Sequence, residues 1–209
     1  GCIDLNAINY NPVAIYNDGS CEYECIDIDD NIYETVQVGD QFWMAENLKV
    51  THYRNGDPIP TGYTNEEWSN LDDTDSGAFA IYDDDQGNVD IYGNLYNWYA
   101  VYESLGICPE GWQVPSDSEW SDLTNYLGSE AGGKLKETGF DHWNSPNTGA
   151  TNESGFTALP GGYRNNGGYI HMGNYNYFWS TTAFNSSSSV GRKLYFNTSS
   201  VHQSHFDNR

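Results

Sequence analysis

The chain of 209 residues has a formal net charge of −22, with 30 Asp and Glu residues against 8 Lys and Arg. Nucleic acids and anionic lipid surfaces are bound through clustered basic side chains, so we expect neither as a partner. No apolar run approaches the ~18 residues of a membrane-spanning helix, so we expect no membrane insertion. Aromatic residues make up 15% of the chain. Disordered acidic chains lack such aromatics, so the sequence predicts a folded protein.

Residues 1–24 are predicted to form a small module of their own. Turn-forming residues dominate GCIDLNAINYNPVAIYNDGSCEYE, and so short a segment needs a covalent staple, which the bracketing Cys2 and Cys21 can supply. The pattern GCxDxNAxNYNPxAxxxDGSC resembles a short cysteine-bracketed repeat of secreted and surface proteins of Bacteroidetes-type bacteria. That resemblance, and a start at Gly1 without an initiator Met, imply a trimmed, exported chain. We therefore expect a secreted or cell-surface protein.

From Cys25 onward the pattern predicts an α+β domain of two short helices and many short antiparallel strands. ETVQVGDQFW alternates polar and apolar residues around Gly39-Asp40, which indicates a hairpin. Residues 92–105 place Leu95, Trp98, Tyr99 and Tyr102 at helical spacing. Residues 114–128 predict the second helix, with Ser116 and Glu119 as a capping box, a buried stripe and Gly128 at the end. Short aromatic runs separated by Gly, Asn and Ser follow.

Six blocks in this domain carry a second resemblance. They are YETVQVGDQFWMAENLK, YGNLYNWYAV, CPEGWQVPSDSEWSDL, GGKLKETG, TNESGFTALPGGYRNNGG and FWSTT. In this order they resemble the Fibrobacter succinogenes major paralogous domain, a family of exported bacterial modules. The resemblance implies a C-type-lectin-like fold for residues 25–209. The family usually closes with a strand reading roughly G-F-x-V-R-C, which this chain lacks; it is truncated or processed, or another segment replaces the strand.

The four cysteines, at positions 2, 21, 25 and 108, predict two disulfides in an exported chain. Three pairings are possible from the count alone, and the bracketed module favours Cys2–Cys21. The cysteine that would face Cys108 in the related family is absent from this chain. Cys25 is then the remaining candidate partner of Cys108.

Asp83, Asp85 and Asp90 surround Gln86-Gly87-Asn88 in an acidic loop. Alternating carboxylates around a glycine can converge on Ca²⁺, so this loop is a candidate calcium site. The terminal Glu of an EF-hand loop is absent, and the alternative is a solvated acidic turn. No organic cofactor is expected.

Catalytic signatures are missing from the sequence. It contains no G-x-S-x-G and no H-E-x-x-H motif. His142, His171, His202 and His205 lie outside any motif and are expected to be surface or hydrogen-bonded side chains. We therefore expect a protein that is not an enzyme.

The C-terminal third is rich in Tyr, Asn and Ser, which is the composition of adaptable recognition surfaces. We expect Tyr169, Tyr175, Asn176 and Tyr177 on an exposed binding face and Trp179 in the core. The predicted function is an extracellular binding or adhesion module that recognises glycan or protein. The alternative is a structural subunit of a surface filament or layer, in which copies of the chain assemble by strand addition.

Overall fold

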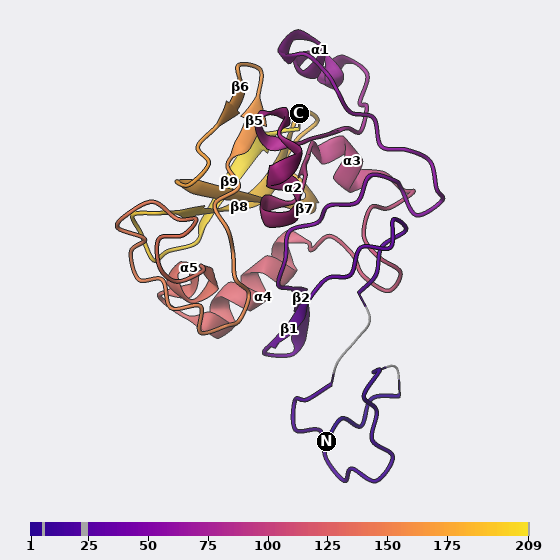
Figure 1. Cartoon of the computed structure of the whole chain (residues 1–209), viewed down its shortest axis with the longest axis vertical. Helices are drawn as coiled ribbons and strands as arrows, with labels where there is room; N and C mark the ends of the chain where they lie inside the picture. Colours follow the sequence, from indigo (N-terminus) through magenta and orange to yellow (C-terminus); the bar gives the residue numbers. More distant parts are fainter. Residues whose placement is uncertain (6, 22–24, 209) are drawn as a thin grey trace.

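The computed structural model describes residues 1–5, 7–21 and 25–208 (Figure 1). The described strands are β1 Thr35–Val38, β2 Gln41–Met44, β3 Phe79–Ala80, β4 Leu95–Tyr96, β5 Tyr163–Asn165, β6 Gly168–Ile170, β7 Tyr175–Ala183, β8 Ser188–Tyr195 and β9 His202–Asp207. The α-helices are α1 Asn65–Ser69, α2 Val89–Tyr92, α3 Trp98–Tyr102, α4 Asp117–Leu127 and α5 Ala131–Leu135. The 3₁₀ turns are η1 Leu71–Asp73, η2 Tyr82–Asp84 and η3 Gln86–Asn88. The predicted α+β class is confirmed, but the described part has five α-helices instead of two.

The strands form four small antiparallel sheets. Three of them have two strands each, β1-β2, β3-β4 and β5-β6, and the fourth has the order β7-β8-β9. In that sheet Tyr175 lies opposite Tyr195, Tyr177 opposite Lys193 and Trp179 opposite Gly191. Two-stranded sheets are marginal by themselves, so side-chain packing must hold the sheets together.

The two best-defined local patterns form as predicted. β1 and β2 pair around Gly39, whose φ of +63° suits the turn. Helix α4 begins at the capping box of Ser116 and Glu119, in which each side chain accepts a hydrogen bond from the other residue's backbone N–H. Gly128 follows its last residue with φ +80°. Both the hairpin and the capping box depend on residues close together in the chain, so the sequence pattern could predict them.

The predicted helix over residues 92–105 is mostly wrong. Beyond Tyr92, the last residue of α2, only Trp98–Tyr102 is helical, and Leu95–Tyr96 pairs with β3 instead. Asn97 causes the change, because its side chain accepts hydrogen bonds from the backbone N–H groups of Ala100 and Ala78. Asn97 therefore caps α3 at its first turn and also holds Ala78, the residue before β3.

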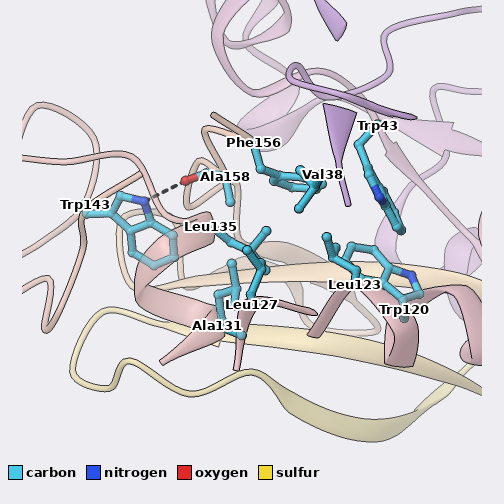
Figure 2. Packing of buried hydrophobic residues seen from close by; sticks show 11 residues of the cluster. Val38, Trp43, Trp120, Leu123, Leu127, Ala131, Leu135, Trp143, Phe156 and Ala158 are labelled. Carbon is cyan, nitrogen blue, oxygen red and sulfur yellow. Dashed lines mark hydrogen bonds between the residues drawn. The ribbon is translucent and has the colours of Figure 1, made fainter. Parts of the chain in front are cut away.

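The larger hydrophobic cluster lies between α4, α5 and the β1-β2 hairpin (Figure 2). The ring centroids of Trp43 and Trp120 are 4.8 Å apart. At the far end of the cluster, Trp143 donates its indole N–H to Ala158 O at 2.9 Å. A second cluster packs around Trp98. Aromatic rings thus supply much of the core.

The N-terminal module lies at one end of the long axis, away from the C-terminus (Figure 1). Cys2 and Cys21 form the predicted disulfide, with their Cα atoms 4.7 Å apart. Phe42 of β2 packs against the module. The predicted boundary at residue 24 falls on residues 22–24, which lie outside the described residues.

The predicted Cys25–Cys108 disulfide is absent, and this prediction is wrong for the structure. Both residues are buried free thiols. Burial raises the pKa of each thiol to about 12, and the nearby Cys108 also raises that of Cys25. Burial therefore favours the neutral thiol form of both cysteines, and the thiolate is the more reactive form.

Lys136 is a fully buried cation that connects α5 to the end of β8. Its Nζ donates to three carbonyl oxygens, those of Thr148, Tyr195 and Thr198, each at 3.0 Å. The ammonium also lies 5.3 Å from the ring centroid of Trp143. Burial lowers the pKa of Lys136 to about 8.

We predict that Lys136→Met lowers the free energy of unfolding by about 1–3 kcal/mol, because three partly buried carbonyl oxygens lose the donor that they share. Urea unfolding measures the change. The matched control is Lys134→Met, whose ammonium makes only a 3.6 Å ion pair with Glu153; we expect it to change stability by less than about 0.5 kcal/mol. Equal effects of the two substitutions would show that the Lys136 bonds are unimportant.

We predict that thiol alkylation modifies neither Cys25 nor Cys108 in the native protein and modifies both after unfolding. Peptide mapping should recover the Cys2–Cys21 link, which closes a loop worth roughly 3 kcal/mol in the chain-entropy account. Recovery of a peptide that joins Cys25 to Cys108 would contradict the structure.

Candidate functional site

The acidic loop predicted to bind calcium does not assemble a metal site. Within residues 1–5, 7–21 and 25–208, no group of three His, Cys, Asp or Glu side chains is arranged to hold a metal ion. Asp83, Asp85 and Asp90 are all exposed, and Asp85 accepts a hydrogen bond from the N–H of Gly87 at 2.9 Å. Its carboxylate thus closes a local turn, so the predicted calcium ligands do not converge. The solvated acidic turn describes this loop better.

The four residues of the predicted binding face do not form one exposed surface. Asn176 is buried, with 4% of its surface exposed, and donates to Leu159 O. Tyr169 lies apart, on β6, where its hydroxyl donates to Asp84 Oδ1 at 2.6 Å. Tyr175 and Tyr177 are half-buried on β7. The predicted exposure is therefore wrong for Asn176, and Tyr169 lies on another sheet than Tyr175 and Tyr177.

A chain of aromatic rings runs across the β7-β8-β9 sheet and includes Tyr175 and Tyr177. The ring centroids of Tyr175 and Tyr195 are 4.8 Å apart, and those of Tyr177 and Phe206 are 5.3 Å apart. Lys193 Nζ lies 5.0 Å from the ring centroids of both Tyr177 and Phe206. This is the geometry of a cation held by aromatic faces, and burial lowers the pKa of Lys193.

Trp179 has two roles in this region. Its indole N–H donates to Tyr96 O at 2.7 Å, and its ring packs against the second hydrophobic cluster. The core position predicted for it is thus confirmed on one side. On the other side, Trp179 borders a cavity.

The cavity has a volume of about 1250 Å³, which exceeds the roughly 300–1,000 Å³ usual for small-molecule pockets. All of β2, both residues of β4 and Asn176–Trp179 of β7 line it. Asp4 and Ile8 of the N-terminal module and Phe206 of β9 also border it. Elements that are distant in sequence therefore share one hollow.

Four buried polar atoms on residues that line the cavity have no hydrogen-bond partner. They are Trp43 Nε1, Trp68 Nε1, Asn94 Oδ1 and Arg164 Nε. Each residue is at least nine-tenths buried, with exposed fractions of 9%, 1%, 8% and 7%. A buried donor or acceptor without a partner costs roughly 1–3 kcal/mol, so native proteins rarely keep several together. Each of these atoms is covered by its neighbours, so a ligand in the cavity could reach it only if neighbouring side chains moved.

The cavity was not predicted from the sequence, and four of its main residues were missed. Trp43 and Trp68 are in the first half of the chain, far from the Tyr-rich third. Arg164 and Lys193 did carry a signal, because residues 134–209 hold six basic side chains against four carboxylates in an otherwise acidic chain. Their convergence depends on tertiary structure.

We predict that Gly191→Ala disturbs the packing of Phe206 on the β7-β8-β9 sheet, because a Cβ at this position would overlap the Phe206 ring and lie 2.5 Å from Phe178 O. The free energy of unfolding should fall by about 1–3 kcal/mol. Gly161→Ala is the control, since its Cβ would make only ordinary contacts at 3.7 Å. Chemical denaturation measures both, and an unchanged stability of Gly191→Ala would argue against the packing of Phe206 on β8.

Comparison with known proteins places the chain in a family. The model of the Fibrobacter succinogenes major domain matches residues 36–207, which include β2 to β9, all of β1 except Thr35, and most of the residues that line the cavity. No curated protein and no solved structure matches the chain. Because the match covers most of the sequence, the chain belongs to the Fibrobacter succinogenes major domain family.

Proposed function

We propose that the protein is an extracellular, non-enzymatic binding or adhesion module, and that its ligand, a glycan or a protein segment, occupies the cavity of about 1250 Å³. The observation that carries the proposal is the cavity itself, which brings aromatic side chains of β2, β7 and β9 to one hollow.

The chemistry of the lining supports binding over catalysis. The cavity-lining residues include no histidine, so no imidazole is placed there as a general base. The lining thiol, Cys108, has its pKa raised to about 12 by burial, whereas a nucleophilic cysteine needs a lowered pKa. Glu119 is held in the capping box of α4.

Export is supported by the Cys2–Cys21 disulfide, because such bonds persist in oxidising compartments. In the described part of the chain, no helix has the length and apolar character needed to span a bilayer. Assembly from copies of the chain remains an alternative prediction. The net charge of −22 opposes contact between copies.

The aromatic side chains that border the cavity support a polymeric ligand with flat or apolar faces. Tyr177, Trp179 and Phe206 border the cavity on the side of the β7-β8-β9 sheet, and Trp43 and Trp112 border it elsewhere. Rings of this kind give large contact area at a small cost in conformational entropy. Such a wall suits the apolar face of a sugar and also an apolar side chain.

We predict that the whole chain binds selected members of an array that carries oligosaccharides and peptides side by side. For the strongest binder, Tyr177→Ala should weaken binding about tenfold or more, as truncated interface aromatics do. Tyr175→Ala is the matched control, because Tyr175 lies on the same strand but not among the cavity-lining residues. We expect it to change affinity less than about twofold.

Both substitutions should lower stability to a similar degree, because both rings are half-buried in the same aromatic chain. Differential scanning calorimetry provides that comparison. An array on which nothing binds would contradict the proposed function, and equal losses of affinity would place the ligand outside the cavity.

A further inference from the structure

Lys193 of β8 is a cation that lines the cavity. Its Nζ lies 5.0 Å from the ring centroids of both Tyr177 and Phe206. It makes no hydrogen bond and no ion pair with any described residue. An ammonium has three N–H donors, and aromatic faces attract its charge without the lone pair of a conventional acceptor. The acceptors for these donors must therefore come from solvent or from a ligand.

The ammonium of Lys193 is open, whereas the nearby guanidinium groups are engaged. Arg164, the other basic residue of the lining, is buried and donates to Tyr63 O. Arg192, the preceding residue of β8, pairs with Asp117 Oδ1 at 2.6 Å. Neighbours do not cover Lys193 Nζ as they cover the unpartnered Nε of Arg164. Among the described basic residues of the lining, Lys193 is thus the one that a ligand can reach without a rearrangement.

The sheet face that carries Lys193 has no carboxylate from the strands of that sheet. On this face, Tyr177 of β7 and His202 of β9 lie directly opposite Lys193. β7 and β8 contain no Asp or Glu. The carboxylate of β9, Asp207, directly follows Phe206, so alternation puts its side chain on the other face. An anion beside Lys193 therefore meets no negative charge from its own sheet.

The other charges of the cavity limit the ligand to few negative groups. Glu46 follows β2 and Glu110 precedes α4, and both line the cavity and are exposed. Together with the net charge of −22, they oppose a polyanion. A single carboxylate in contact with Lys193 is favoured instead, because partial burial weakens both the hydration of the ammonium and the screening by salt.

Aromatic rings beside Lys193 favour a sugar as the carrier of this carboxylate. Tyr177, Trp179 and Phe206 all line the cavity, and the ring centroids of Trp179 and Phe206 are 5.4 Å apart. Such rings offer apolar contact area next to the charged group. A uronic acid or a similar acidic sugar has a C–H face and a carboxylate on one ring, so it can use both features at once.

The strand edge nearest to these rings argues against an extended peptide. Backbone and indole N–H groups already occupy positions along the outer side of β7. These bonds are Gly162 N–H to Tyr175 O at 3.0 Å, Thr181 N–H to Pro115 O at 3.0 Å and Trp120 Nε1–H to Trp179 O at 3.1 Å. A peptide added there would lack the row of backbone partners that strand addition requires. A saccharide needs no such row.

We infer that the cavity binds a saccharide with one acidic sugar unit, whose carboxylate accepts hydrogen bonds from Lys193 Nζ while its C–H face packs against the neighbouring aromatic rings. The inference rests on the proposed binding function and specifies the class of its ligand. It makes Lys193 the residue that selects an acidic sugar over a neutral one.

An array of acidic saccharides and their carboxyl-reduced forms, probed with the whole chain, tests the inference. Reduction turns each carboxylate into a neutral alcohol and leaves the rest of the molecule unchanged. At least one acidic saccharide should bind with an affinity about tenfold or more above that of its reduced form, as expected for a charge-assisted hydrogen bond.

Substitutions of Lys193 locate the carboxylate. Lys193→Met retains an unbranched side chain without the charge, so it should remove the preference and change the affinity for the reduced saccharide less than about twofold. Lys193→Arg keeps the charge and should retain a preference for the acidic form. Lys134→Met removes one positive charge from a residue outside the cavity lining. It should leave the preference unchanged, and it controls for the overall charge of the chain.

Reductive methylation of the wild-type chain gives a second measurement that needs no variant. At a saturating concentration, the acidic saccharide should slow the methylation of Lys193 by about threefold or more, because the bound form is protected. Lys134 should react at the same rate with and without the saccharide. The reduced saccharide at the same concentration should protect Lys193 less.

A preference for the acidic form that survives in Lys193→Met would overturn the inference. Equal binding of the acidic and reduced forms by the wild type, or unchanged methylation of Lys193 at saturation, would overturn it as well. So would binding of peptides to the exclusion of saccharides. In each of these cases the proposed binding function would stand, whereas no binding of any saccharide or peptide would contradict the proposed function itself.

Discussion

Indole N–H groups bonded to backbone carbonyls hold this fold together. The sheets have at most three strands in the described chain, so backbone pairing alone cannot unite them. Trp98 and Trp120 donate to consecutive carbonyls of β7, and Trp179 of β7 donates to Tyr96 of β4. Through these three bonds, α3, α4 and β4 are fixed to one strand, while the same rings bury apolar surface.

This construction explains why the cavity lies where it does. Indoles and a glycine cover both ends of the outer edge of β7, and the stretch between them faces the hollow that β2 and β4 also border. The indoles of Trp43 and Trp68 lie on the same lining but have no acceptor in the described chain.

The sequence predicted those features whose causes are local. The β1-β2 hairpin, the capping box of α4 and the Cys2–Cys21 bracket each depend on residues close in the chain or on a module too small to fold without a staple. The expected helix over residues 92–105 failed because Asn97 bonds to Ala78, nineteen residues earlier. In the described structure the carboxylates of the acidic loop do not converge, and Asp85 accepts a hydrogen bond within its own turn. Sequence patterns do not show which hydrogen-bond partner a polar side chain will take in the folded protein.

The candidate site could be predicted only in part. The aromatic richness of the C-terminal third did point to Tyr177, which lines the cavity. Asn176, its neighbour, also lines the cavity, but it is buried instead of exposed, because alternation along β7 turns its side chain to the buried side. Trp43 and Asn94 join Arg164 and Lys193 only through the packing of separate sheets, which no spacing in the sequence reveals.

Exchange of the tryptophan indole protons, followed by NMR, tests this account most directly. The account predicts slow exchange for the hydrogen-bonded indoles of Trp98, Trp120, Trp143 and Trp179. It predicts faster exchange for Trp43 and Trp68, whose indole N–H groups have no acceptor. Equal protection of all six indoles would contradict it, because Trp43 and Trp68 would then have acceptors as the other four do.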